Sequence, residues 1–449
     1  MIAKYTRPGM ARVWTDRAKL VTWLRVELAA IKARCNLGIF EPGIFSRIRS
    51  RARFRVQDVR IQEAVIHHDL QAFVDVVRRS LLPALRKYLH RKMTSYDTEV
   101  PALALQFRQA GKILLQGLDQ LIEALRVQAS QHMWTFCMGI THGQDAEPMT
   151  LSLRFCGYLE MMVRARQHLV KCLEEIEEVK FSGAVGSYFS ITPAEEAEVC
   201  RILNLRVRSA ATQIVARDVF ARFLSELAII GRDIEKMAND LCILAMTAYG
   251  EVQEPRTKKQ KGSSIMPHKI NTILLERIKG LAGEALAGYA TMGLGIIRTW
   301  LERDIAHSSV ERIAFPDATI TLDYVLHLMT RIIKDIVINR DVMARGINRT
   351  RGCWASGRVK EMLEDKGFDP EDVYVFVQQC AFTTMKDRRR TFRSVLLASK
   401  LPHKKRTLGQ MISVRELDAC FDFRTPLTER LPEVYERNGL DLELALPPN

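Results

Sequence analysis

The segment from Lys261 to Asn271 combines the residue types that an anion-binding or proton-transfer loop would use. It contains a flexible glycine, two serine hydroxyls, a proline and a cation, Lys269, six residues after Ser263. Apolar residues follow at once, at 273–278, and predict the start of a helix. Because N–H groups at a helix N-terminus favour negative charge, such a loop can bind an anion and present a reactive hydroxyl. Composition alone favours a simpler interpretation, an exposed linker.

The spacing within this loop resembles the signature of the fumarase/aspartase superfamily, Gly-Ser-Ser-x-Met-Pro-x-Lys-x-Asn. The form with His268 is similar to that of the adenylosuccinate lyase family. Further strings resemble that family and follow its order from residue 4 to residue 312. They are Lys4-Tyr5-Thr6-Arg7-Pro8, His68-Asp69, Thr94-Ser95, Thr141-His142-Gly143 with Ala146-Glu147-Pro148, Ser182-Gly183-Ala184-Val185-Gly186, Thr212-Gln213, and the run from Glu302 to Arg312.

The resemblance implies an all-α fold of three helical domains, with a long central helix bundle that assembles into a homotetramer core. Each active site would be built from three subunits and bind an anionic nucleotide. The implied reaction is a β-elimination that releases fumarate from adenylosuccinate, giving AMP, and from the succinylated imidazole carboxamide intermediate of purine biosynthesis. The aci-carboxylate that develops needs electrostatic support, and the leaving nitrogen needs an acid. The resemblance implies no metal and no organic cofactor.

The proton transfers are assigned by the same resemblance. Ser263 matches the base, and its hydroxyl would have to be activated as an alkoxide by loop N–H groups, a helix end and Lys269. His142 matches the general acid, since histidine titrates near neutral pH. Glu276 matches the glutamate that pairs with this histidine and would raise its pKa. His68 matches a second active-site histidine.

The implied substrate contacts are mostly cationic or polar. Arg303, Ser308 and Arg312 match phosphate and substrate contacts, because the arginine fork binds oxyanions in a bidentate way. A surface ion pair with a neighbouring glutamate is the alternative for these arginines, and a core position on a helix over residues 65–77 is the alternative for His68. The other implied substrate-binding residues are Lys4 and Tyr5 at the nucleotide end, Asp69, His90 near the phosphate, and Thr94, Ser95, Thr141, Gln213, Lys269 and Asn271 around the succinyl group.

Several departures from the family pattern lie beside this expected site. Lys4 replaces an arginine, Lys92 a glycine and Tyr96 a serine. They bear on the nucleotide end of the substrate more than on the elimination, because every proton-transfer position is retained. The other departures are Thr272 for a proline, Leu274-Leu275 for Gly-Ser, Gly283 for an arginine, Ala216 for a glutamine and Leu301 for a histidine.

Two alternatives remain open beside this lyase interpretation. One is a sister enzyme of the superfamily that eliminates fumarate from a different N-succinyl substrate. The other is a helical scaffold that has lost activity and uses its basic surface to bind partners. Retention of the serine, both histidines, the glutamate and the lysine of the implied catalytic set argues against the scaffold.

The elements that must position these residues are predicted to be helices. Apolar residues recur at three- and four-residue steps between Phe107 and Leu125, as on one face of a helix. Alternating strand patterns are scarce, with residues 185–189 a short possible exception. Other long proline-free helical stretches cover residues 151–179, 202–248, 274–300 and 319–343. Turn-rich segments between them suggest three parts, an N-terminal helical domain (1–97), a central long-helix bundle (98–349) and a C-terminal helical domain (350–449).

Composition narrows the class of protein. The chain of 449 residues is 47% hydrophobic and 27% charged, which is typical of a soluble globular protein, and it shows no membrane-spanning run and no signal peptide. Nine scattered cysteines without a CxxC pair indicate free thiols in a reducing compartment, by default the cytoplasm. The net charge of +15 could serve nucleic acid, a membrane surface or an anionic small substrate. The densest basic segment, 386–406, lacks interleaved aromatic residues, so we expect a solvated helix face there and no nucleic-acid site.

Overall fold

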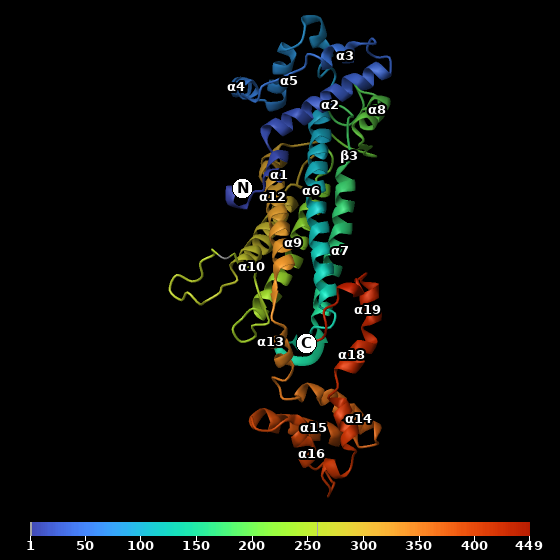
Figure 1. Cartoon of the computed structure of the whole chain (residues 1–449). Coiled ribbons are helices and arrows are strands. Elements are labelled where there is room, and N and C mark those ends of the chain that lie inside the picture. The colour runs from blue at the N-terminus through green and yellow to red at the C-terminus, as the bar shows by residue number, and fades with distance from the viewer. Residues whose placement is uncertain (1, 258) are drawn as a thin grey trace. The chain divides into compact units, whose positions relative to one another are not determined.

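The computed structural model describes residues 2–257 and 259–449 and consists mainly of α-helices (Figure 1). They are α1 (Pro8–Val13), α2 (Asp16–Asn36), α3 (Ile44–Arg49), α4 (Val56–Ile66), α5 (Asp69–Arg79), α6 (Ser95–Gln131), α7 (Leu151–Ile176), α8 (Pro193–Leu203), α9 (Asp218–Leu244), α10 (Ile273–Ile278), α11 (Leu286–Gly295), α12 (Ala306–Asp335), α13 (Arg340–Ile347), α14 (Ser356–Asp365), α15 (Pro370–Lys386), α16 (Phe392–Ala398), α17 (Val414–Cys420), α18 (Arg424–Arg430) and α19 (Pro432–Arg437). A π-helical segment, Lys279–Ala285, joins α10 to α11. The predicted all-α class is confirmed.

The described strands are short and form three separate two-stranded pairs. They are β1 (Phe136–Thr141), β2 (Gln144–Thr150), β3 (Glu178–Val179), β4 (Arg206–Val207), β5 (Val252–Gln253) and β6 (Val337–Ile338). β1 and β2 form an antiparallel hairpin, β3 and β4 pair in parallel, and β5 and β6 pair antiparallel. All nine cysteines are free. Across the described part of the chain, no helix is both long and apolar enough to cross a membrane.

The chain forms two compact units, each made of separate stretches of sequence. The first comprises Met1–Leu121, Met162–Ala238 and Glu276–Thr330. Its core is aromatic where α6, α9 and α12 meet: the ring of Phe107 lies 5.0 Å from that of Phe223 and 4.9 Å from that of Phe315. All three side chains are buried, which confirms the helical face predicted from the apolar spacing. At Gly231 on α9, an added Cβ would lie 2.4 Å from the carbonyl oxygen of Ala282, so only glycine permits this close helix crossing.

The second unit comprises Ile122–Met161, Asn239–Leu275 and Arg331–Asn449. In it, α13 packs on β1, and the buried Tyr435 hydroxyl donates to the carbonyl oxygen of Met133 at 2.9 Å. A separate cluster joins α14, α15, α16 and α17 through buried Leu363, Phe376 and Phe392.

Several predicted boundaries were wrong for local reasons. The stretch 202–248 is two helices, because Asn204 ends α8 in the left-handed conformation (φ 54°) and an extended segment precedes α9. The stretch 319–343 is mainly α12, which begins at Ala306 and ends before β6. The helix expected over 65–77 breaks at His67, which is left-handed (φ 53°). Residues 185–189 form turns and no strand.

Candidate active site

His142 lies at the tip of the β1–β2 hairpin in the second unit. Thr141 pairs with Gln144, so His142 and Gly143 form a two-residue loop, and both have positive φ (52° and 74°). A two-residue loop with both residues left-handed matches the twist of a hairpin, and histidine tolerates this conformation better than most residues. All three residues of the Thr141–Gly143 string are exposed. Within residues 2–257 and 259–449, the His142 side chain has no hydrogen-bond partner or ion pair.

The loop with Ser263 closes on itself. The backbone N–H of Met266 donates to Ser263 Oγ at 3.2 Å, and the N–H of Lys269 donates to the carbonyl oxygen of Met266 at 2.9 Å. An added Cβ on Gly262 would lie 3.1 Å from the carbonyl oxygens of Pro267 and Lys269, so the closed loop is tight around this glycine. Ser263 is half-buried, whereas Lys269 and Asn271 are exposed. The donated N–H is the kind of interaction that stabilises negative charge on a serine oxygen.

The helix that follows the loop is capped by a buried carboxylate. Glu254, only 2% exposed, accepts the backbone N–H groups of Leu274 at 3.0 Å and of Leu275 at 3.2 Å. These N–H groups at the start of α10 are therefore taken by Glu254, and any stabilisation of a Ser263 alkoxide falls to the loop itself and to Lys269. Glu276 is exposed on the same helix.

In the first unit, the start of α5 meets α12. His68 is the N-cap of α5, and its Nδ1 accepts the N–H of Gln71 at 3.3 Å. The next residue, Asp69, accepts a hydrogen bond from Arg312 Nη2 at 2.7 Å. Burial raises the pKa of Asp69, but the Arg312 hydrogen bond and the charge of Lys19 outweigh it, so the pKa is lowered overall. The structure therefore brings Asp69 and Arg312, both predicted substrate-binding residues, into one ion pair.

Thr94 and Ser95 lie at the start of α6, where a buried ion pair holds Thr94. Asp97 accepts the N–H of Thr94 at 2.9 Å and of Gly183 at 3.1 Å, and Lys180 Nζ lies 2.7 Å from its carboxylate. Both charged side chains are almost fully buried, with exposed fractions of 0% and 1%. Burial lowers the pKa of Lys180, and the Asp97 carboxylate opposes that shift. The Asp97 carboxylate thus binds the backbone of two of the strings, at 94–95 and 182–186.

A hydrogen-bonded chain joins the string 182–186 to two further strings. Gln213 Nε2 donates to the carbonyl oxygen of Ala184 at 2.9 Å, and Arg303 Nη1 donates to Gln213 Oε1 at 2.6 Å. Ser308 lies in the first turn of α12, whose Ala306 N–H donates to Asp304 at 2.6 Å. The residues of the run 302–312 therefore lie at a helix N-terminus, a favourable place for an anion.

The remaining predicted contacts lie in two other places. His90 Nδ1 is 2.7 Å from the buried Glu27 carboxylate, which also accepts the hydroxyl of Thr98 at 2.7 Å. Burial lowers the pKa of His90, but the charge of Glu27 and its hydrogen bond together outweigh burial, so the pKa is raised overall. The ring of Tyr5 lies 5.4 Å from that of Tyr324, with Lys4 Nζ 5.8 Å from the Tyr5 ring. The structure thus gives His90 a structural ion pair and places it in none of the clusters above.

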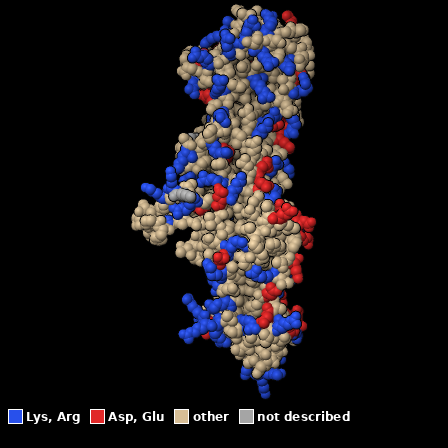
Figure 2. Space-filling model, in the orientation of Figure 1, with Lys and Arg blue, Asp and Glu red and all other residues tan. Residues whose placement is uncertain are grey.

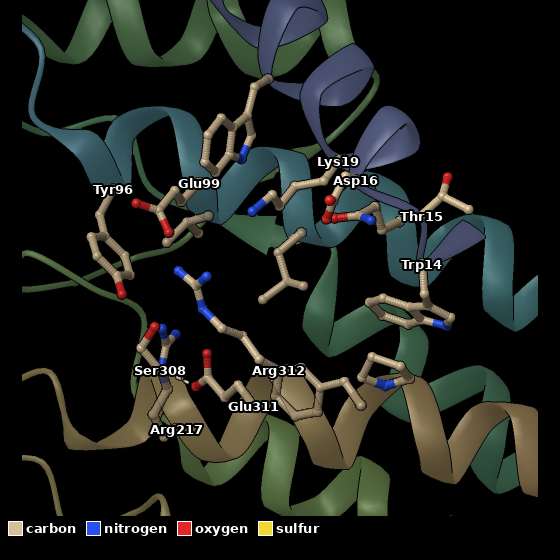
Figure 3. A pocket seen from close by; sticks show the side chains of 16 residues that line it. Trp14, Thr15, Asp16, Lys19, Tyr96, Glu99, Arg217, Ser308, Glu311 and Arg312 are labelled. Atoms are coloured by element: carbon tan, nitrogen blue, oxygen red, sulfur yellow. Dashed lines mark ion pairs between the residues drawn. The ribbon is translucent and has the colours of Figure 1, made fainter. Parts of the chain in front are cut away.

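A cavity of about 260 Å³ in the first unit adjoins the Asp69–Arg312 pair. Arg312 and Ser308 from α12, Tyr96 and Glu99 from α6 and Lys19 from α2 line it (Figure 3). Arg217 and Glu311 form an ion pair of 2.9 Å at one side. The sequence singled out Tyr96 only as a departure and did not select Glu99, Lys19 or Arg217, because tertiary packing alone brings α2, α6 and α12 to one cavity.

Glu99 has an environment that disfavours its charge. Burial, followed by the charge of Asp69, raises its pKa to about 7, against the opposing effects of Arg312, Lys19 and Arg303. Its ordinary pKa is 4.5, so the folded protein binds this proton more tightly than the unfolded chain between pH 4.5 and 7. Ionisation of Glu99 therefore costs stability as the pH rises through this range.

We predict that Glu99→Gln removes the loss of stability that Glu99 ionisation causes as the pH rises. We subtract the free energy of unfolding of the parent from that of the variant at each pH. This difference should increase by up to about 3 kcal/mol from pH 4.5 to pH 8. Urea unfolding at a series of pH values measures the difference. Glu123→Gln, at an exposed glutamate of the same helix, serves as the control and should not change it. Parallel pH curves for Glu99→Gln and the parent would contradict the assignment.

Basic side chains are spread over the visible surface, with acidic ones in fewer groups (Figure 2). In the segment 386–406, most of the lysines and arginines are exposed, as predicted. Their placement differs from the predicted helix face, because most of them lie in the loops on either side of α16. Among described residues, no group of three or more His, Cys, Asp or Glu side chains is arranged to hold a metal ion.

Comparisons with known proteins address the resemblance directly. A family model described as "Lyase" matches residues 3–287. Adenylosuccinate lyase of Synechocystis sp. is 38% identical over 97% of this chain and 99% of its own length, and that of Bacillus subtilis is 36% identical over 98% of this chain and 100% of its own. Among solved structures, fumarate lyase from Mesorhizobium sp. BNC1 has a TM-score of 0.84 at 20% identity, covering 96% of this chain and 98% of its own. The 3-carboxy-cis,cis-muconate lactonizing enzyme from Pseudomonas putida has the same TM-score at 24% identity, covering 97% and 99%.

The fold and the family model define the chain as a lyase of the fumarase/aspartase superfamily. The identity with curated relatives extends over almost the whole chain and well beyond the strings that first indicated it. Within the superfamily, the chain belongs to the adenylosuccinate lyase family.

Proposed function

We propose that the protein releases fumarate from adenylosuccinate, giving AMP, and from the succinylated imidazole carboxamide intermediate of purine biosynthesis. The observation that carries the proposal is the near full-length similarity to adenylosuccinate lyases, combined with retention of every proton-transfer residue of the signature strings. A carbon next to a carboxylate is a weak acid, so the reaction needs a base, an acid and strong electrostatic support for the aci-carboxylate.

The proton transfers are assigned as follows. Ser263 removes the proton from carbon as an alkoxide, with the Met266 N–H and the charge of Lys269 supporting the oxygen. The C–N bond then breaks, its electron pair goes to the leaving nitrogen, and protonated His142 supplies the proton. Glu276 keeps His142 protonated, and His68 contacts the reacting end of the substrate. No metal or organic cofactor is assigned to these steps.

The anionic groups of the substrate are assigned to the cationic clusters of the first unit. Arg303, Ser308 and Arg312 bind phosphate, with Asp69 orienting the last of them through the 2.7 Å ion pair. The assigned succinyl-end and nucleotide-end contacts are Thr94, Ser95, Thr141, Gln213, Lys269, Asn271, Lys4, Tyr5 and His90. Positive charge gathered at helix N-termini raises the local concentration of an anionic substrate and speeds its binding.

We also propose a homotetramer with sites shared between subunits, and the exposure of the assigned groups supports it. His142, Lys269 and Glu276 are exposed in the chain by itself. An elimination of this kind requires water to be excluded from the charged intermediate. We therefore propose that neighbouring subunits cover these residues, in a cytoplasmic enzyme whose chain has helical domains at 1–97, 98–349 and 350–449.

The decisive experiment incubates the purified protein with adenylosuccinate and follows its absorbance, with AMP and fumarate identified by mass spectrometry. Stoichiometric formation of both is the expected result. Cleavage of a different N-succinyl compound, with adenylosuccinate left intact, would point instead to a sister lyase. An absence of fumarate from all of these substrates would leave the inactive scaffold as the better description.

A further inference from the structure

Tyr96 occupies a position between several cationic groups of the site. Its side chain is only 4% exposed, and the centre of the Arg303 guanidinium lies 4.2 Å from the centre of its ring. The Arg217 guanidinium is 5.9 Å from the same ring, and the His307 ring meets it edge-on at 5.9 Å. A cation over an aromatic face is attracted by the ring quadrupole, most strongly where water is excluded.

The guanidinium of Arg303 is fixed from a second direction by Gln213. The Gln213 amide nitrogen donates to the carbonyl oxygen of Ala184, which sets the orientation of the amide and leaves its oxygen to accept Arg303 Nη1 at 2.6 Å. The loop that carries Ala184 is fixed in turn, because an added Cβ on Gly186 would lie 2.0 Å from the carbonyl oxygen of Ala211. Arg303 is thus held by a hydrogen bond at one nitrogen and by the cation–π contact with the Tyr96 ring.

A second donor of the Arg303 guanidinium, Nε, makes no such hydrogen bond within the described residues. Its Nε is buried and has no hydrogen-bond partner in the described part of the chain. A buried guanidinium N–H without a partner is costly, and an oxyanion that binds there recovers that cost. The contacts with Tyr96 and Gln213 therefore hold Arg303 in place but leave its Nε–H donor without a hydrogen bond.

We propose that Tyr96 is a positioning residue for substrate binding: its ring orients the Arg303 guanidinium for the anionic end of the ligand. The inference rests on the proposed function and extends it, because the family pattern has a serine here and a serine cannot stack. Two consequences follow. Stacking is a property of the ring, so the hydroxyl of Tyr96 is dispensable. The effect passes through Arg303, so it should disappear when that arginine is changed.

The test compares Tyr96→Phe, which keeps the ring, with Tyr96→Leu, which removes it. For Tyr96→Leu we expect KM for adenylosuccinate and Kd for AMP, measured by calorimetry, to rise about tenfold, with kcat within about twofold of the parent. Tyr96→Phe should stay within about twofold in all three. Phe73→Leu, at a buried ring that meets Trp23 edge-on, is the control for a general loss of packing and should lower Tm without raising KM.

A double-mutant cycle checks the route through Arg303. If the ring acts through this guanidinium, Tyr96→Leu should raise Kd for AMP very little in an Arg303→Met background, which lacks the cation. Equal losses in the Phe and Leu variants, an effect confined to kcat, or additive losses in the cycle would overturn the inference. These outcomes are distinct from failure of the proposed function, which would appear as an inactive parent, because the calorimetric cycle with AMP requires no turnover.

Discussion

Ser263→Ala is expected to lower kcat for fumarate release by about 10³-fold, with Tm and AMP affinity close to those of the parent. The reason is chemical: alanine cannot accept the proton, and the remaining loop offers no other basic atom at that position. The Ser263 hydroxyl already accepts the N–H of Met266, the interaction that would support an alkoxide. Single-turnover measurement of fumarate release, with and without the substitution, gives the size of the loss.

The matched control for this variant is the neighbouring hydroxyl. Ser264 is exposed, and Ser264→Ala changes the composition of the loop by the same amount. We expect its kcat to fall by less than about tenfold. If both alanine variants lost activity equally, the loop as a whole would be important and the assignment of the base to Ser263 would be wrong.

The second large effect is expected in stability, at the buried Asp97–Lys180 pair. Asp97→Asn leaves the Lys180 ammonium buried without its ion-pair partner and weakens the bonds to Thr94 and Gly183. Breaking such a pair from one side typically costs about 3–5 kcal/mol, because the remaining charge stays desolvated. Urea unfolding at neutral pH should show this loss.

A surface pair provides the comparison for Asp97. Asp119 on α6 pairs with Arg166 on α7, and both side chains are about half exposed, at 51% and 40%. Asp119→Asn should therefore cost less than about 1 kcal/mol. Replacing both buried partners, as Asp97→Leu with Lys180→Met, should recover part of the loss of the single variant. Similar costs for Asp97→Asn and Asp119→Asn would show that burial of the Asp97 pair carries no special penalty.

The sequence predicted the long helices well because their apolar spacing is regular. Phe107 and Leu114 are fully buried on the face that the pattern selected. The break between α8 and α9 was not predictable in the same way, since residues 204–217 contain no proline or glycine. That segment is held extended by tertiary contacts, among them the β3–β4 pairing and the hydrogen bond from Arg208 Nη2 to the Glu175 carbonyl.

The candidate site also combines residues that the sequence predicted with residues that only tertiary packing brings together. The strings identified its polar residues through resemblance, and the structure joins Asp69 with Arg312 and Gln213 with Arg303. The residues that surround them come from helices that sequence spacing cannot bring together, as with Lys19 beside Glu99. The β1–β2 hairpin was also missed, because an irregularity of the pairing between Met138 and Ile140 disrupts the alternation that would have revealed it.

The tight turn at the hairpin tip has a consequence for how the imidazole should be studied by mutagenesis. A β-branched substitute such as valine would resist the left-handed geometry at position 142, so its activity loss would combine backbone distortion with the missing proton donor. Asparagine accepts the same geometry, so His142→Asn isolates the chemistry. Protein engineers who wish to alter the acid while preserving the scaffold should choose among side chains with that conformational tolerance.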